Sequence, residues 1–198
     1  TLNRDVEAII HDYFNSPIKV EIAAHGTPVE SIEQSAYFLP NYYTKINMLK
    51  LLLRQEELKK VVVFVARKRW ADRLYEYLLE DFDEGEMDII HSNKSQNYRI
   101  NALKKFADGE FRILLATDVI ARGIDVTDIS HVISFDIPDY PDNYIHRIGR
   151  TGRAKKSGKS IALVTKLEVD YFKDVEELMQ IEVPRIALPD DLDMLLQK

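Results

Sequence analysis

The chain has 198 residues, 45% of them hydrophobic, which is enough to bury a sizeable core and predicts one domain of ordinary size plus an appendage. It contains no cysteine, which excludes a disulfide framework and cysteine-based metal sites and fits a reducing, cytoplasmic location. The formal net charge of −6 argues against a protein that binds polyanions with its whole surface, but it leaves room for a local basic cleft. No apolar run approaches the roughly 18 residues of a membrane span, and the start lacks a signal peptide and an initiator Met, so we expect a non-membrane fragment.

The predicted elements alternate between strand and helix along most of the chain. Residues 5–14 predict a short amphipathic helix and residues 18–24 a strand, followed by a connector. Further strands are expected at 32–39, 61–66, 87–91, 112–117, 131–136 and 160–165. Helices are expected between and after them at 43–55, 68–82, 96–107, from 141, and at 167–180. The strands are short, rich in Val and Ile and mostly continuous in hydrophobicity, which is typical of an α/β fold with a parallel sheet covered by helices on both faces.

Two of these segments lead to simple structural predictions. Helix 68–82 places an apolar face on the core, made of Ala71, Leu74, Tyr75, Leu78, Leu79 and Phe82. The tail IEVPRIALPDDLDMLLQK is acidic and interrupted by proline, so we expect it to run over the surface or to begin a linker.

Cations follow the strand at 61–66. Arg67, Lys68 and Arg69 stand at the start of the next helix, where positive charge opposes the helix dipole. Contact with phosphate would explain them, and a solvated helix start is the equally weighted alternative. Ligands of open α/β sheets bind beyond the carboxyl ends of the strands, which is where these cations lie.

The segments after the next two strands carry further polar residues at the same edge. In HSNKSQNYR, Ser95 suits a helix N-cap, and Gln96 with Arg99 on the first turn suggests a site for a nucleic-acid phosphate. In ATDVIARGIDV, Thr117 and Asp118 end a buried strand and Asp125 follows a glycine-containing turn. An Asx-capped turn is the alternative for this second segment.

The most basic stretch is HRIGRTGRAKKSGKS, which has six Lys or Arg and no acid. If a helix from residue 141 continues to Arg153, then His146, Arg150 and Arg153 form one stripe, with Tyr144 and Ile148 opposite. Arginine suits a phosphoryl group because its planar fork donates two hydrogen bonds, whereas the alternative is an exposed basic helix. SGKS is not a phosphate-binding P-loop, because the glycine spacing is wrong and a strand follows it.

VVVFVARKR, HSNKSQNYR, LLATDVIARGIDV and HRIGRTGR resemble, in order and spacing, motifs IV, IVa, V and VI of the DEAD-box RNA helicases. The resemblance covers residues 32–185 and implies the second RecA-like domain, with a C-terminal extension at 186–198. Residues 1–24 resemble the end of the first RecA-like domain, and 25–31 would be the interdomain linker. VPRIALP is similar to the RhlE-type bacterial members. The motifs of the first domain are missing, so the fragment alone should not hydrolyse ATP.

The resemblance implies roles toward ATP for four residues. Arg150 and Arg153 would contact the γ-phosphate, with Arg153 most like an arginine finger. Asp125 would take the ribose hydroxyls, and His146 would couple the two domains. ATP and Mg²⁺ would be bound mainly by the missing N-terminal domain, and no metal ligand is expected in this chain.

The resemblance also implies RNA contacts and an interdomain network. Contacts to the sugar-phosphate backbone are expected from Gln96, Arg99 and Thr117, with Arg67 and Lys68 as additions. Arg122, Arg147 and Asp118 would organise the interdomain network. Ser92 stands where the family usually has Gly, so the resemblance implies a less close backbone approach to RNA at this loop.

The implied function is an ATP-dependent RNA helicase that unwinds or remodels RNA duplexes with ATP hydrolysed at a cleft between two domains. Its partners would be RNA, bound with little sequence preference, and the N-terminal RecA-like domain. A non-catalytic RecA-like module that binds RNA or protein is the alternative, and a DNA helicase is a third reading. A dimer through residues 1–24 is a further hypothesis, because an unpaired strand edge attracts a partner.

Overall fold

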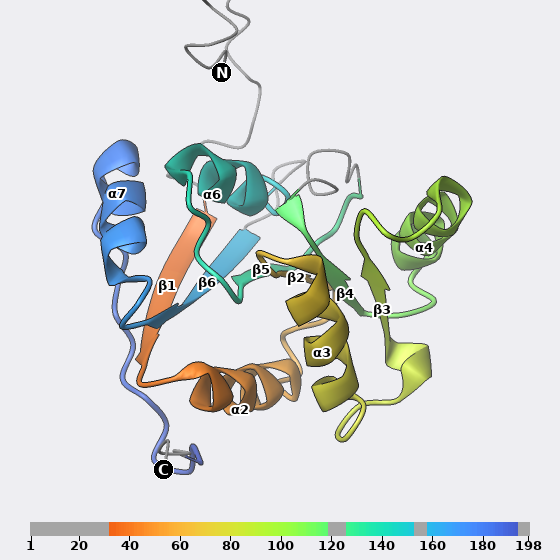
Figure 1. The fold of residues 1–198 in the computed structure, drawn as a ribbon, viewed down its shortest axis with the longest axis horizontal. Coiled ribbons are helices and arrows are strands. Elements are labelled where there is room, and N and C mark those ends of the chain that lie inside the picture. Colours follow the sequence, from red (N-terminus) through yellow and green to blue (C-terminus); the bar gives the residue numbers. More distant parts are fainter. Residues whose placement is uncertain (1–31, 119–125, 153–157, 194–198) are drawn as a thin grey trace, which may run out of the picture.

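The computed structural model describes residues 32–118, 126–152 and 158–193, and the predictions for residues 1–31 lie outside this part. Within it, the strands form one parallel sheet in the order β1-β6-β5-β2-β4-β3 (Figure 1). The strands are β1 (Ile32–Leu39), β2 (Val61–Phe64), β3 (Met87–Ile90), β4 (Ile113–Ala116), β5 (His131–Ser134) and β6 (Gly158–Thr165). The predicted fold class is therefore confirmed.

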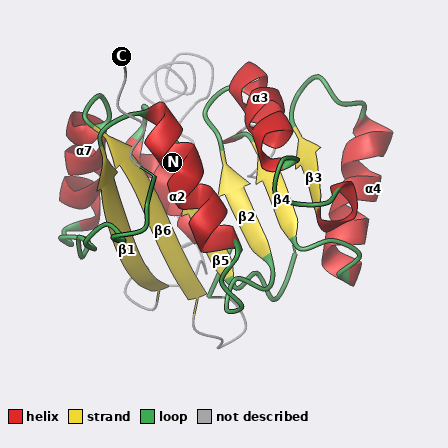
Figure 2. Ribbon diagram, turned by 90° about the horizontal axis from the view of Figure 1, so that it is seen from below, coloured by secondary structure: helices red, strands yellow, loops and turns green. Residues whose placement is uncertain are grey.

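Helices cover both faces of the sheet (Figure 2). They are α2 (Tyr42–Leu53), α3 (Lys68–Leu78), the 3₁₀ turn η2 (Glu84–Glu86), α4 (Gln96–Asp108), α6 (Pro141–Ile148) and α7 (Val169–Met179). Helices α2 and α3 pack on one face, whereas α4, α6 and α7 pack on the other. Because successive strand side chains point to opposite faces, both sets of β2 residues are buried, Val61 and Val63 toward α2 and α3, Val62 and Phe64 toward α4.

Local signals fix where several helices begin and end. The Asn41 side chain accepts a hydrogen bond from the Thr44 N–H at 3.0 Å at the start of α2. Ser95 does the same for the Tyr98 N–H at 3.2 Å, so its predicted N-cap role is confirmed. Gly109, with φ of +79°, ends α4 in the left-handed conformation that glycine adopts most easily.

The prediction for helix 68–82 is partly wrong. The helix ends at Leu78, and Leu79 at its C-cap is 36% exposed, so Leu79 does not belong to the core. Ala71, Leu74 and Phe82 are buried as expected. The periodic pattern continued past the end of the helix because the following turn also returns one apolar side chain, Phe82, to the core.

The tail is anchored to the sheet more firmly than its composition predicted. The Ala36 N–H of β1 donates to the Pro184 carbonyl and the Ile186 N–H donates to the Ala36 carbonyl, both at 2.9 Å, so this segment pairs with the outer edge of β1. Leu192 is 5% exposed and joins the core beneath α2 and α3. Among the described residues, no helix is both long and apolar enough to cross a membrane.

Candidate functional site

The carboxyl ends of neighbouring strands bring the predicted polar residues to one edge of the sheet. Strand β2 lies between β5 and β4, and β3 lies beside β4, so the segments that follow them are adjacent. Arg67 and Lys68 follow β2, and Gln96 and Arg99 follow β3. Thr117 directly follows β4, and it is 6% exposed there. Open α/β sheets bind ligands at this edge, which we call the ligand edge.

A buried ion pair fixes helix α6 to this edge. Arg147 is fully buried, and its Nε and Nη2 donate to the two Asp118 carboxylate oxygens at 2.5 and 2.7 Å. Its Nη1 donates to the Asp136 carbonyl at 2.5 Å, and its guanidinium lies 5.4 Å from the centre of the Phe64 ring. One side chain therefore joins α6 to the ends of β2, β4 and β5. The guanidinium is engaged inside the domain, and the interdomain part of its predicted role stays a prediction.

The end of α6 differs from the predicted continuous helix. The helix ends at Ile148 with Gly149 as its C-cap, and Gly152 has φ of +68°, so the stripe of His146, Arg150 and Arg153 on one helix is wrong. The two glycines weaken the helix. The Thr151 hydroxyl donates a hydrogen bond to the Ile129 carbonyl at 2.5 Å, which holds the chain after Gly149 away from the helix axis.

The structure still brings His146 and Arg150 together. His146 is exposed, Arg150 is half-buried, and Arg150 Nε donates to the His146 carbonyl at 3.1 Å. Tyr144 and Ile148 are buried on the opposite side, as the sequence predicted. Arg153, Asp125 and Arg122 lie outside the described residues.

The start of α4 presents a second polar group. Arg99 is half-buried and its Nη2 donates to the exposed Gln96 side-chain oxygen, so the two residues act as one unit. The Tyr98 hydroxyl donates to Asp88 in β3 at 2.5 Å, which fixes this first turn to the sheet. Burial, together with the Asp88 carboxylate, raises the pKa of Tyr98, so this phenol stays protonated and can donate.

Sequence reasoning missed the histidine that holds the loop before α4. His91 is 2% exposed, its Nδ1 accepts from the Asn93 N–H at 3.3 Å, and its Nε2 lies 2.9 Å from Asp72 of α3. These partners assign the proton to Nε2, which then donates to Asp72. Lys68 donates to the Asn93 side chain at 2.7 Å. The loop that includes Ser92 is thus tied to α3, and the position of His91 directly after β3 was the available signal.

A buried lysine was also missed. Lys45 of α2 is 1% exposed, and its Nζ lies 2.9 and 2.7 Å from the two Glu168 oxygens and 3.5 Å from Asp136. Glu168 in turn accepts from the Thr165 and Ile137 N–H groups. The other Asp136 oxygen accepts from the Ala66 N–H at 2.8 Å, directly before Arg67. This network connects α2 to the ends of β2, β5 and β6 and so orders the ligand edge.

The described residues hold no group of three His, Asp or Glu that could bind a metal ion. The site contains cationic and amide side chains that follow β2 and β3, together with His146 and Arg150 at the end of α6. Such groups can bind phosphates and stabilise negative charge, and they provide no loop that could enclose a triphosphate.

Comparison with known proteins defines the class. The family model described as "Helicase conserved C-terminal domain" matches residues 44–155, so the chain belongs to this family. Its fold is that of the RecA-like C-terminal domain of DEAD-box proteins. It is similar to E. coli SrmB in complex with RraA, with a TM-score of 0.74 and 34% identity over 84% of this chain and 96% of that one. It is also similar to S. cerevisiae Dbp5 bound to RNA and ADP BeF3, with a TM-score of 0.81 and 28% identity over 94% of this chain and 49% of that one.

Two bacterial relatives share the sequence along almost the whole chain. The ATP-dependent RNA helicase DbpA of Bacillus subtilis is 35% identical over 198 residues, which cover 100% of this chain and 41% of the relative. The RNA helicase CrhR of Synechocystis sp. is 34% identical over 96% of this chain and 38% of the relative. The chain therefore spans about two fifths of the length of these relatives. The resemblance to DEAD-box helicases is confirmed, and the RhlE-type assignment stays a prediction.

Proposed function

We propose that the chain is the C-terminal half of an ATP-dependent RNA helicase, which unwinds or remodels RNA duplexes together with an N-terminal RecA-like domain. The observation that carries the proposal is the arrangement of the ligand edge. The Arg147–Asp118 pair fixes α6 there with His146 and Arg150 at its end. The Gln96–Arg99 pair lies at the same edge, at the start of α4. The names of the relatives support ATP and RNA as the ligands.

The α6 end is the side we assign to ATP. Arg150, with Arg153, would contact the γ-phosphate, because guanidinium groups stay charged and stabilise the charge that spreads over the transferred phosphoryl oxygens. Asp125 would bind the ribose hydroxyls, and His146 would couple the two domains. ATP and Mg²⁺ would be held mainly by the N-terminal domain, and this chain would complete the site with these four side chains.

The α4 side is the part we assign to RNA. Gln96, Arg99 and Thr117 would contact the sugar-phosphate backbone, with Arg67 and Lys68 nearby. Contacts of this kind carry little sequence information, so we expect weak sequence preference. Because ATP and RNA would both favour a closed cleft between two domains, each should strengthen the binding of the other by the same factor.

ATP turnover of a protein that includes both domains tests the proposal. We expect single-stranded RNA to stimulate turnover and Arg150→Ala to lower the stimulated rate by about 10³-fold, the lower limit for arginines that stabilise the transferred phosphoryl group. Lys173→Gln is the matched control, because it removes one exposed cation from the outer helix α7. Turnover that is absent, or that is insensitive to Arg150, would instead favour the non-catalytic RNA- or protein-binding module.

We also propose a cytoplasmic location, which the absence of cysteine supports. Imaging of a fluorescent fusion in the source cell tests it, and a membrane or secreted signal would refute it.

A further inference from the structure

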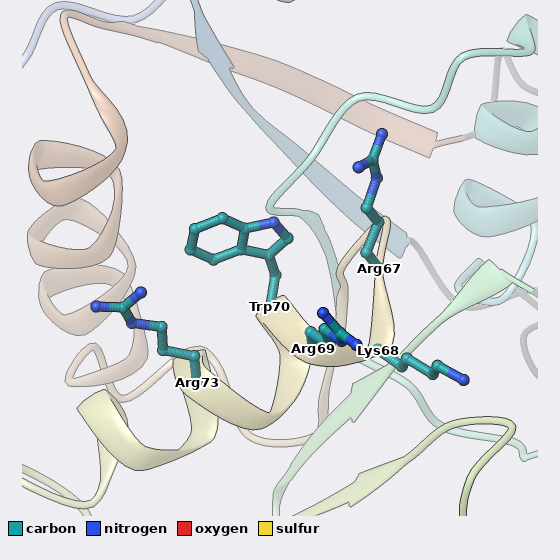
Figure 3. Close-up of a pocket in the computed structure, with 5 residues that line it drawn as sticks. All are labelled: Arg67, Lys68, Arg69, Trp70 and Arg73. Carbon is teal, nitrogen blue, oxygen red and sulfur yellow. The ribbon is translucent and has the colours of Figure 1, made fainter.

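Among the residues that the structure describes, five side chains at the start of α3 line a pocket of about 700 Å³, which we call the Trp70 pocket (Figure 3). They are Arg67, Lys68, Arg69, Trp70 and Arg73. Trp70 and Arg73 point toward α2, whereas Lys68 points to the other side of α3 (Figure 3). The pocket thus lies at the start of α3, beside Tyr42 at the start of α2, at the ligand edge of the sheet.

The lining is cationic although the chain as a whole is acidic. Four of the five lining residues are Lys or Arg, in a chain with a net charge of −6. Within the part of the chain that the structure describes, Arg67, Arg69 and Arg73 form no ion pair with a carboxylate. These exposed side chains place several positive charges around the pocket, which favours the binding of an anion there.

Aromatic contacts support the Trp70 side chain, which lines the pocket. Trp70 is 41% exposed, and its ring lies 5.0 Å from Tyr42. Tyr42 packs edge-on against the core residue Phe135 at 5.5 Å, so the support reaches the sheet. The Arg73 guanidinium lies 5.7 Å from the Trp70 ring. A supported, partly exposed indole beside guanidinium groups offers a surface for a flat aromatic ligand that carries negative charge.

One residue of the pocket contacts the loop that precedes α4. Lys68, which lines the pocket, donates to Asn93 at 2.7 Å, and Asn93 lies in the loop that leads to Gln96 and Arg99. Because Lys68 and Trp70 point to opposite sides of α3, an RNA strand that contacts both would have to cross the start of this helix (Figure 3).

We propose that the Trp70 pocket is an additional RNA subsite in which one nucleobase stacks on Trp70 while flanking phosphates contact Arg67 and Arg73. The proposal rests on the proposed function and extends it, because it adds a contact to a base where the other groups contact only the backbone. Base stacking accepts every base and favours those that stack strongly, so the subsite should prefer purines modestly.

Trp70 is the only tryptophan of the chain, so its fluorescence reports on this pocket directly. We would titrate the 198-residue chain with an oligoadenylate of about ten nucleotides, inorganic polyphosphate of similar charge, and an acidic peptide that contains Phe. In parallel, the affinity of labelled oligoadenylate would be measured for Trp70→Ala, Arg99→Gln and the control Lys173→Gln. Circular dichroism would verify that each variant is folded.

We expect oligoadenylate, but not polyphosphate, to quench Trp70, and Trp70→Ala to weaken binding roughly five- to hundredfold. Lys173→Gln should bind normally. If RNA binds with an affinity that depends on Arg99 but leaves Trp70 fluorescence unchanged, the subsite is refuted and the proposed function remains. Equal quenching by polyphosphate would reduce the pocket to a charge site, and quenching by the peptide alone would make it a protein-docking site. Absence of both RNA binding and RNA-stimulated turnover would refute the proposed function itself.

Discussion

Replacement of Asp118 by asparagine tests the buried ion pair that holds α6. The variant keeps the shape of the side chain but removes the negative charge that faces the fully buried Arg147 guanidinium. Removing one partner of a buried pair costs about 3–5 kcal/mol of stability, because the other charge is left uncompensated. The Asp118 side chain is 26% exposed, so water relieves part of this cost and we expect the low end, about 3 kcal/mol.

Urea unfolding followed by circular dichroism measures this effect. With a urea dependence of about 2 kcal/mol/M, the midpoint should fall by about 1.5 M. Asp174→Asn on α7 is the control, because this carboxylate is exposed and its loss should cost less than about 0.5 kcal/mol. Arg147→Met should cost less than Asp118→Asn, since the remaining carboxylate reaches solvent, and the double variant should cost less than the two single variants added together. A midpoint for Asp118→Asn that matches the control would refute the reasoning.

Three further predictions concern other parts of the molecule. Gly158→Ala should lower the free energy of unfolding by about 2 kcal/mol, because a Cβ there would lie 2.3 Å from the Gly152 nitrogen. Gly85→Ala is the control, because a Cβ there would have no atom within 4 Å and the stability should stay unchanged. Thermal melts compare the two variants, and equal melting temperatures would contradict the prediction. Burial, and then the Lys159 ammonium, lower the pKa of His131 below its usual 6.5, so the unfolded chain binds the proton more readily and stability should fall as pH drops below about 6.5. His131→Gln should flatten this dependence between about pH 7 and 5, and an unchanged slope would exclude His131 as its source. Arg99→Gln should weaken RNA binding equally for all RNA sequences. It should also reduce the slope of log affinity against log salt concentration by about 0.7, which titrations at several salt concentrations measure. A loss of affinity for some RNA sequences only would argue against a phosphate contact.

The central strands β2 and β4 were predictable because each is a continuous run of buried apolar residues, a pattern that a parallel sheet buried on both faces imposes. The end of α6 was not predictable from the sequence. Its position depends on the hydrogen bond from Thr151 to the Ile129 carbonyl, and local periodicity does not reveal this partner. The wrong placement of Leu79 in the core has the same cause, because the turn after α3 is determined by the packing of Phe82 and not by helical spacing.

The cations of the candidate site were found because Lys and Arg without acidic neighbours are conspicuous in an acidic chain. Lys45 was missed because YTKINML looks like an ordinary amphipathic helix, and its partner Glu168 is 123 positions away in the sequence. His91 was missed because its importance depends on Asp72, which a separate helix supplies. Polar residues whose role is to order the site are thus harder to predict than those that face the ligand, because burial and partners arise only from the tertiary fold.

The pairing of β1 with β6 has a consequence for how the domain forms. Ile32 at the start of β1 lies beside Gly158 at the start of β6, so the first described strand has its sheet partner at the end of the series. Such pairing closes a very long loop before it gains any contact, which slows folding. During synthesis, β1 must therefore wait until nearly the whole domain has left the ribosome. The half of the sheet formed by β2, β3 and β4 can assemble first, and the side of the ligand edge that carries His146 and Arg150 is completed last.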